Sequence, residues 1–254
     1  GSEAHAMTPR RKFLIRGGLA LAGGVLAACA SARDEFAAQR RRLLREIEAD
    51  MRRTASYTGR ERLAPCVATA LGRVERHRFV PADVAAYAYE NRPLPIGHGQ
   101  TISQPFIVAL MTELLDPQPA HVVLEVGTGS GYQAAVLAEC VRKVYSIEIV
   151  APLGERARAT LEALGYRNVE VRIGDGYLGW PEAAPFDGIV VTAAPEHVPQ
   201  PLLDQLKPGG RMVIPVGAQA GGQDLLLITK QADGRTITQR KLPVRFVPLT
   251  RERR

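Results

Sequence analysis

Short apolar runs rich in β-branched residues alternate with segments of helical apolar spacing through most of the chain after residue 121. The runs have the length of buried strands, and strands are expected at 122–126, 143–147, 169–173, 186–192, 210–215, 224–230 and 235–241. Helices are expected between them at 131–140, 152–164 and near 199–206. Alternating strands and helices predict a doubly wound, mostly parallel α/β sheet. The turn at 232–234 predicts that the last two strands form an antiparallel hairpin at the edge of this sheet.

The chain before residue 122 has a helical pattern instead. Segments 67–74 and 81–89 predict short helices that form an N-terminal cap over one end of the sheet. Upstream, the arginine-rich segment 31–62 predicts an amphipathic helix with a solvated polar face, and contact of that face with a membrane surface is the alternative. Its apolar residues recur at roughly helical intervals, at Phe36, Leu43, Leu44, Ile47 and Met51.

Residues 8–29 resemble an export signal of the twin-arginine type, with a lipoprotein cleavage site at its end. GSEAHA precedes Met7, so these six residues read as an added tag and the native start is expected at Met7. The pair Arg10 and Arg11 comes before the apolar segment 19–28, which is far shorter than the ~20 residues that span a bilayer. Cys29 ends the sequence LAAC, which resembles a lipobox with a lipidated cysteine. We therefore expect a lipid-anchored protein of the periplasm or envelope. If the segment is only a short helix with a chance cysteine, a cytoplasmic location is expected.

The excess of basic residues is confined to the N-terminal part. The whole chain has a net charge of +7 and a pI of about 9.6. Residues 1–28 carry four Lys or Arg and one acid, and residues 29–62 carry nine and six, which leaves 20 and 19 for the rest. The part from 63 to 254 is therefore almost neutral, and nucleic-acid binding loses its main support. With 46% hydrophobic residues in the chain, this part can bury the core of one domain.

A tight glycine cluster follows the first strand of the expected sheet. Gly127, Gly129 and Gly131 stand between the strand 122–126 and the next helix. Glycines let a backbone approach a ligand closely, and the helix N-terminus offers unpaired N–H groups. Glu148 ends the next strand, 21 residues after Gly127, where a carboxylate can accept hydrogen bonds from both hydroxyls of a ribose. These spacings predict a nucleoside site at the carboxyl ends of the strands.

The form of the loop distinguishes it from other nucleotide-binding loops. Tyr132 stands where the dinucleotide motif needs its third glycine, and no Lys-Ser/Thr pair follows, which excludes a P-loop. The form E-x-G-x-G-x-G that starts at Glu125 resembles motif I of the S-adenosylmethionine-dependent methyltransferases. Over roughly residues 73–249 the chain resembles the protein-L-isoaspartate (D-aspartate) O-methyltransferase family. The segments that carry this resemblance are GQTISQP (99–105), GDGYLGWP (174–181), TAAP (192–195), LKPGG (206–210) and VRFVPL (244–249).

The resemblance implies a Rossmann-like methyltransferase domain, which we expect over 63–254. The residue patterns before it predict a tag and export signal over 1–28 and a charged helical arm over 29–62. Family enzymes transfer the methyl group of S-adenosylmethionine to the α-carboxylate of L-isoaspartyl residues in damaged proteins. The ester then collapses to a succinimide, whose hydrolysis returns some normal aspartate. The substrate carboxylate is already ionised at neutral pH, so the reaction needs alignment rather than a general base. The implied partners are isoaspartyl proteins and peptides, and the chain is expected to be a monomer.

The resemblance also implies roles for individual residues. Ser103 is expected to act catalytically, as a hydroxyl donor beside the methyl group and the substrate carboxylate; a turn or helix cap before Pro105 is the structural alternative. Asp175 is expected at the adenine, or in a simple Asx turn. Cofactor-binding residues are expected at Gly127, Thr128, Gly129, Gly131, Glu148, Asp175 and Gly176. Substrate-binding residues are expected at Thr101, Ile102, Gln104, Thr192, Ala193, Ala194 and Pro195. The small residues among them would equally suit close packing.

No metal site is expected, because His77, His98 and His197 lack metal-ligand spacing. Cys66 and Cys140 are single and far apart, which favours free thiols over a disulfide. Two rival functions remain. One is a methyltransferase for another carboxylate or small-molecule acceptor. The other is a non-catalytic envelope protein that keeps the fold, which gains weight because an exported enzyme would need a supply of cytoplasmic S-adenosylmethionine.

Overall fold

The computed structural model describes the backbone of residues 22–251 and the side chains of residues 36–251. The arginine pair at 10–11 and residues 19–21 of the apolar segment lie outside the described residues, and so do the side chains of the rest of that segment and of Cys29. The chain divides into two compact units, Gly1–Ala38 and Gln39–Arg254. None of the helices within residues 22–251 combines the length and hydropathy that a bilayer-spanning helix needs.

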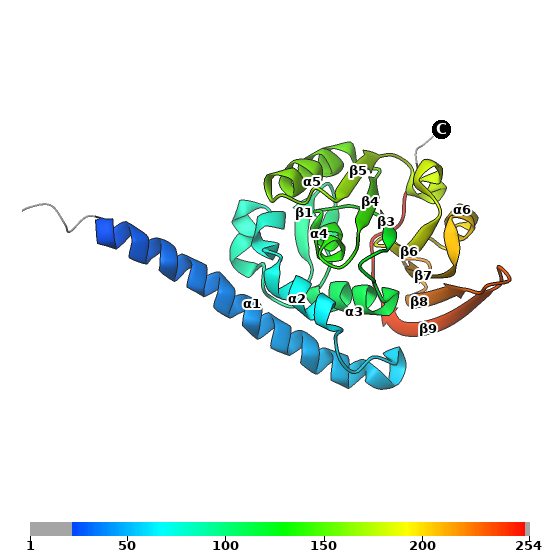
Figure 1. Ribbon diagram of the computed structural model, residues 1–254, viewed down its shortest axis with the longest axis horizontal. Helices are drawn as coiled ribbons and strands as arrows, with labels where there is room; N and C mark the ends of the chain where they lie inside the picture. The colour runs from blue at the N-terminus through cyan, green and yellow to red at the C-terminus, as the bar shows by residue number, and fades with distance from the viewer. Residues whose placement is uncertain (1–21, 252–254) are drawn as a thin grey trace, which may run out of the picture. The chain divides into compact units, whose positions relative to one another are not determined.

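The second unit is built on a seven-stranded sheet in the order β5-β4-β3-β6-β7-β8-β9 (Figure 1). The strands from β5 to β7 run parallel, and β8 and β9 pair antiparallel, which confirms the expected mostly parallel sheet with an antiparallel edge hairpin. The order reverses direction between β3 and β6, the point where doubly wound sheets bind ligands. The strands are β3 (Val122–Val126), β4 (Lys143–Glu148), β5 (Val169–Ile173), β6 (Phe186–Val191), β7 (Leu206–Val216), β8 (Gln223–Lys230) and β9 (Thr236–Val244).

Helices cover the parallel strands. Helix α4 (Tyr132–Ala138) packs against β4, α5 (Ala151–Ala163) against β5 and β4, and α3 (Pro105–Leu115) against β6 and β7. Short elements complete this part of the fold: α6 (Gln200–Asp204) and the 3-10 helices η3 (Gly176–Leu178) and η4 (Pro181–Ala183). The core at the centre of the sheet contains Leu124, Ile189 and Phe186, all fully buried.

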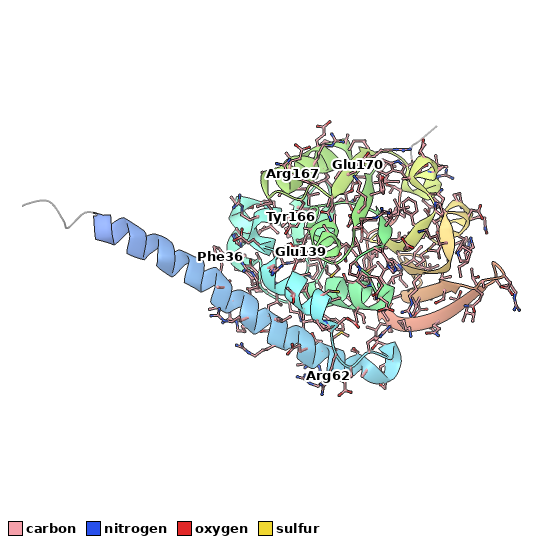
Figure 2. The ribbon with its side chains drawn as sticks, in the orientation of Figure 1. Phe36, Arg62, Glu139, Tyr166, Arg167 and Glu170 are labelled. Atoms are coloured by element: carbon pink, nitrogen blue, oxygen red, sulfur yellow. The ribbon has the colours of Figure 1, made fainter. Side chains whose placement is uncertain are left out.

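The N-terminal cap consists of α2 (Pro65–Arg73) and the 3-10 helices η1 (Arg76–Phe79) and η2 (Ala82–Tyr87). Helix α2 packs against α3 and α4, and its Arg73 pairs at 3.7 Å with Glu139. Glu139 directly follows α4 and is labelled in Figure 2. The second helix expected in the cap, at 81–89, is the 3-10 helix η2.

Helix α1 (Ala22–Thr58) begins earlier and ends earlier than the expected 31–62. Its residues from Gln39 onward belong to the same compact unit as the sheet. Leu43, Ile47 and Met51, spaced by four residues, are buried there, as the amphipathic pattern predicts.

Three elements near the cap are additions to the sequence-based picture. A two-stranded antiparallel sheet is formed by β1 (Leu94–Gly97) and β2 (Gln100–Ile102), and its turn holds His98 at φ 55°. Helix α3 follows at once, and almost every residue of it is buried. A helix that is apolar on all sides shows no amphipathic period, so the pattern gave no signal for it.

Candidate active site

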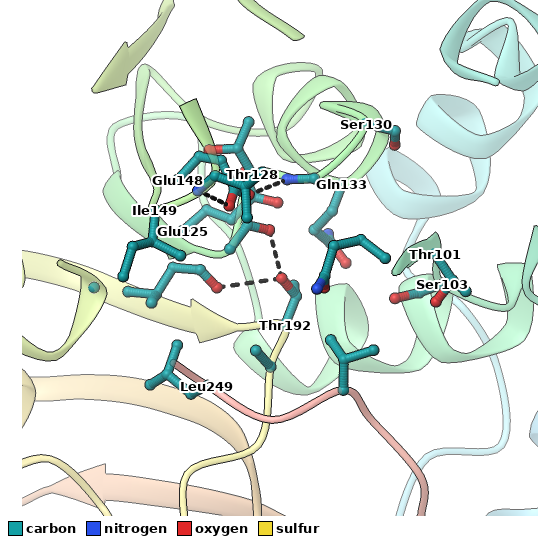
Figure 3. A pocket seen from close by; sticks show the side chains of 18 of the residues that line it. Thr101, Ser103, Glu125, Thr128, Ser130, Gln133, Glu148, Ile149, Thr192 and Leu249 are labelled. Atoms are coloured by element: carbon teal, nitrogen blue, oxygen red, sulfur yellow. Dashed lines mark hydrogen bonds between the residues drawn. The ribbon is translucent and has the colours of Figure 1, made fainter. Parts of the chain in front are cut away.

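A pocket opens at the carboxyl ends of β3, β4 and β6 (Figure 3). It encloses about 770 Å³ when the open mouth is included. Its wall combines the glycine loop, the end of β4, the loop after β6, the segment 100–103 and the C-terminal segment 247–250. The motifs on the sheet thus converge at the edge that strand order predicts.

The glycine loop has positive φ angles that residues with a Cβ rarely adopt. Gly127, Gly129 and Gly131 have φ values of 96°, 53° and 89°. The amides of Gly127 and Thr128 both donate to the carbonyl of Ile147 on β4, at 2.8 and 3.2 Å. Gly127 and Gly129 line the pocket, whereas a Cβ on Gly131 would meet Leu161 and Ala157 of α5. Gly131 therefore serves the packing of α4 on α5 rather than the pocket wall.

Glu148 stands at the end of β4 with both carboxylate oxygens held by backbone donors. Its Oε2 accepts from the amide of Gly129 and its Oε1 from the amide of Val150, each at 2.8 Å. The side chain is 6% exposed and lines the pocket. Each oxygen keeps further acceptor capacity, so this carboxylate is fixed in place and can accept hydroxyl donors from a ligand.

Two buried acceptor oxygens in the pocket wall have no partner among the described residues. They are Oε1 of Glu125, on β3, and Oε1 of Gln133, on α4. The other Glu125 oxygen accepts from Ser146 Oγ at 2.6 Å, and Ser146 shares a 2.6 Å hydrogen bond with Thr128. Burial raises the pKa of Glu125 to about 8, with Glu148 adding to the rise and the Ser146 hydrogen bond opposing it. Unsatisfied buried acceptors carry a desolvation cost that a cationic donor in the pocket would remove.

The segment before α3 forms the opposite wall, with Thr101 and Ser103 across the pocket from Glu148 (Figure 3). Within the described part of the chain, no hydrogen bond to the Ser103 hydroxyl is found, and the amide of Phe106 at the start of α3 is capped by Asn91 Oδ1 at 3.0 Å. The Ser103 hydroxyl therefore does not cap this helix. Its side chain faces the pocket and is free to meet a ligand.

A second, larger hollow adjoins the first. Thr101, Ser103 and Thr192 line both, and Gln104 lines only the second. Residues 243–246 line only this hollow, whereas Val247 and Pro248 line both. A ligand in the first pocket and one in the second would thus meet along the boundary that these shared residues form, which includes Ser103.

The loop after β6 ties the pocket to the C-terminal segment. The Ala194 amide donates to the Val247 carbonyl at 2.8 Å, and its carbonyl accepts from the Leu249 amide at 2.9 Å. Ala193 lines the pocket, whereas the Pro195 carbonyl accepts from Gly217 at 3.0 Å, away from it. Ile102 is buried and also lines the pocket.

Asp175 follows β5, and its carboxylate is engaged by protein groups. Oδ1 accepts from the amide of Tyr177 at 2.9 Å, which is the Asx-turn arrangement, and Oδ2 pairs with Arg251 Nε at 3.1 Å. Of the expected adenine pair, Gly176 lines the pocket, and a Cβ on it would strike Val126. Asp175 acts on the pocket by shaping the turn that presents Gly176.

Two arrangements in the cap were outside the sequence-based expectations. Arg76 is fully buried and donates from Nη2 to the Ser103 carbonyl at 2.8 Å. No pattern around Arg76 signals this contact, because it joins residues 27 apart through irregular chain. Cys66 and Cys140, far apart in sequence, are neighbours whose thiols interact, and both are free. Burial raises the pKa of Cys140, which suits a buried thiol rather than a nucleophile. Among residues 36–251, whose side chains are described, no cluster of metal-ligating side chains is found.

Comparison with known proteins gives a consistent result. The family model described as protein-L-isoaspartate(D-aspartate) O-methyltransferase matches residues 57–254. The chain is 60% identical over 238 residues to protein-L-isoaspartate O-methyltransferase 2 of Syntrophobacter fumaroxidans, covering 94% of this chain and 96% of the relative. It is 60% identical over 211 residues to the protein of the same name from a Polaromonas species, covering 83% of this chain and 100% of the relative.

Solved structures agree. A protein-L-isoaspartate O-methyltransferase superposes with a TM-score of 0.72 at 31% identity, covering 82% of this chain and 65%, slightly less than two thirds, of that longer chain. A Plasmodium falciparum structure, described as a β-aspartate methyltransferase in complex with S-adenosyl-L-homocysteine, has a TM-score of 0.65 at 26% identity, covering 74% of this chain and 92% of that chain. The family match over most of the chain, together with a site assembled from the same motifs, shows that this chain belongs to the protein-L-isoaspartate(D-aspartate) O-methyltransferase family.

Proposed function

We propose that the chain transfers the methyl group of S-adenosylmethionine to the α-carboxylate of L-isoaspartyl residues in damaged proteins and peptides. The observation that carries this proposal is the pair of adjoining hollows that share Thr101, Ser103 and Thr192. The first hollow contains the nucleoside-binding elements. The second encloses about 1440 Å³ when its open mouth is included, which leaves room for part of a peptide. Family membership supports the choice of substrate.

The described residues fit the cofactor. Glu148 offers carboxylate oxygens for two ribose hydroxyls, and Gly176 lines the pocket where the adenine would lie. The unpartnered oxygens of Glu125 and Gln133 suit the ammonium of the methionine part, which is a donor of the kind they lack. The Plasmodium falciparum relative was solved with S-adenosyl-L-homocysteine, the product left after methyl transfer.

When bound, S-adenosylmethionine supplies a methyl group on a positively charged sulfur. A substrate carboxylate oxygen forms the new O–CH₃ bond as the S–CH₃ bond breaks, and the products are a methyl ester and S-adenosylhomocysteine. The protein has no proton to remove in this step, so its task is alignment, which is worth roughly 7–11 kcal/mol of a barrier.

Ser103 is placed for this alignment. Its neutral hydroxyl, at the junction of the two hollows, can donate one hydrogen bond to the substrate carboxylate without forming the bidentate ion pair that an arginine would. The attacking oxygen keeps its charge and its lone pair. The later closure to the succinimide uses the substrate's own backbone nitrogen and needs no residue of this chain.

The proposal is tested with labelled S-adenosylmethionine and two peptides that differ only in isoaspartate against aspartate. Purified protein from Ser31 onward is the enzyme. Base-labile methyl incorporation into the isoaspartyl peptide alone is expected. Binding of the cofactor with transfer only to a small carboxylic acid would favour another acceptor. Absence of cofactor binding would favour a non-catalytic protein that keeps the fold.

We also propose that the chain is exported as a monomer and anchored in the envelope through a lipid on Cys29. The support is the order of the arginine pair, the apolar segment and LAAC in the sequence. Labelled palmitate is expected in the full chain and absent from Cys29→Ser when both are expressed in bacteria that process lipoproteins. Equal labelling of the two, or none in either, would contradict the anchor. Light scattering of the protein from Ser31 onward checks the monomer.

A further inference from the structure

Arg76 is a buried cation in the N-terminal cap, and within residues 36–251 it pairs with no acid. Its side chain is 0% exposed. Nε donates to the Ala88 carbonyl and Nη2 to the Ser103 carbonyl, each at 2.8 Å, while Nη1 has no partner among the described residues. The guanidinium lies over the ring of Tyr132, with its carbon 4.8 Å from the ring centroid.

A buried guanidinium has a higher free-energy cost than packing alone would require. Burial lowers the pKa of Arg76 to about 10, so the side chain remains charged at neutral pH. A buried charge without a counter-charge costs more free energy than an apolar side chain of similar volume. Its three engaged contacts are to two carbonyl dipoles and the negative face of an aromatic ring, which compensate only part of that cost.

The contacts of Arg76 join the two sides of the reaction site. Ser103 belongs to the wall that carries the candidate hydroxyl donor, in the turn between β2 and α3. Tyr132 directly follows Gly131 and begins α4, so its position moves with the glycine loop. Both residues line the pocket, and Arg76 lies behind them.

We propose that Arg76 is a positioning residue that fixes the Ser103 turn relative to the glycine loop, and thereby aligns the substrate carboxylate with the methyl donor. This inference rests on the proposed function for its effect on turnover, and on the contacts alone for its effect on the turn. In-line transfer is sensitive to such placement, since a shift of about 1 Å can lower a rate about 100-fold.

The planar shape of the guanidinium is what the arrangement requires. Two N–H groups on different nitrogens reach two carbonyls while the flat face rests on the ring of Tyr132. A lysine is a compact charge on a flexible stem and cannot satisfy the three contacts together. Arg76→Lys therefore keeps the charge and loses the clamp, and Arg76→Met loses both.

The test compares Arg76→Lys and Arg76→Met with Leu71→Ala, a buried substitution on α2 in the same cap that removes no hydrogen bond to the site. All are assayed well below their melting temperatures. We expect both Arg76 variants to bind S-adenosylmethionine within about 3-fold of the wild type, while kcat falls about 10- to 100-fold. Leu71→Ala should lose stability and keep kcat.

Amide hydrogen exchange provides a readout that does not depend on the substrate. Residues 101–106 should exchange faster in the Arg76 variants and residues 143–148 of β4 should not. Unchanged exchange at 101–106 would overturn the inference, and so would a kcat loss that Leu71→Ala reproduces. If the wild type methylates no isoaspartyl peptide, the proposed function fails while the exchange result still decides the role of Arg76. Should Arg76→Met not fold, Arg76→Lys carries the comparison.

Discussion

The Thr192 hydroxyl donates to the carbonyl oxygen of Gly127 at 2.5 Å, and the same hydroxyl lies 3.2 Å from the Val126 carbonyl. Thr192, which directly follows β6, thus holds the end of β3 at the point where the glycine loop begins. Because Thr192 also lines the second hollow, this contact couples the cofactor wall to the substrate wall. It leaves no space for a side chain at residue 127.

Gly127→Ala should therefore weaken the binding of S-adenosylmethionine strongly. A Cβ there would lie 2.5 Å from Thr192 Oγ1, at a φ of 96° that side chains resist. Strain of this kind costs about 1–3 kcal/mol, so we expect an affinity loss of roughly 5- to 100-fold in calorimetry. Gly129→Ala is the matched control, because it also places a Cβ at a positive φ but meets nothing closer than Ile96 at 3.6 Å, so it shares the backbone strain without the clash. Equal losses in the two variants would contradict the steric argument.

Glu148→Gln should weaken the cofactor without unfolding the protein. The amide keeps one oxygen and turns its other group into a donor, which then faces a backbone N–H of Gly129 or Val150. Hydrogen bonds to a charged acceptor contribute about 1.5–3 kcal/mol each, so the dissociation constant should rise by about 10- to 100-fold. Glu170→Gln serves as the control, since that carboxylate pairs with Lys143 away from the pocket. An unaltered dissociation constant in Glu148→Gln would remove the ribose role.

Ser103→Ala should separate turnover from cofactor binding. The hydroxyl makes no hydrogen bond that the described residues show, so its loss leaves the pocket wall intact. Loss of one donor to a charged oxygen in the transition state should lower kcat by about 10-fold or more, with the cofactor affinity unchanged. Thr101→Val, on the same wall, should lower kcat less. A Ser103→Ala enzyme with wild-type kcat would exclude the hydroxyl from the reaction.

Much of the sheet could be predicted because its strands are short, apolar and separated by clear turns. The glycine loop and Glu148 could be located for the same reason, since both follow strands whose carboxyl ends share an edge. Helix α3 could not be found by periodicity because it is buried on nearly all sides. The strand β7 starts at Leu206 and not at 210 as expected. The prediction was wrong there because the sequence Lys-Pro-Gly-Gly is typical of a turn.

The residues that could not be identified from the sequence make their contacts from loops and short 3-10 helices. Arg76 reaches Ser103 from a 3-10 helix, and Asn91 caps α3 from a loop, supported by Asp50 of α1 at 2.8 Å. Such contacts depend on how loops cross in space, and neither hydrophobic period nor motif spacing encodes that. The contact of Cys66 with Cys140 was missed for the same reason, because α2 and the end of α4 meet only after folding.

The buried carboxyl of Glu125 should make the stability of the cofactor-free protein depend on pH. Burial raises its pKa from 4.5 to about 8 in the folded state, while the unfolded chain keeps the ordinary value. Between these two values the folded protein holds a proton that the unfolded chain releases. The free energy of unfolding should therefore fall as pH rises from about 4.5 to about 8, by at most about 1.4 kcal/mol per pH unit. Above that range the effect of Glu125 should be constant.

Glu125→Gln tests this, because the amide has the shape of the protonated acid and cannot ionise. Urea unfolding at pH 5.5, 7 and 8.5 should show wild-type stability falling with pH relative to the variant. Since other groups titrate in the same range, the difference between the two proteins is the quantity that reports Glu125. Binding of S-adenosylmethionine should reduce that difference, because a cation beside the carboxylate favours its ionised form. Parallel stability profiles without cofactor would show that Glu125 is already ionised in the folded chain at neutral pH.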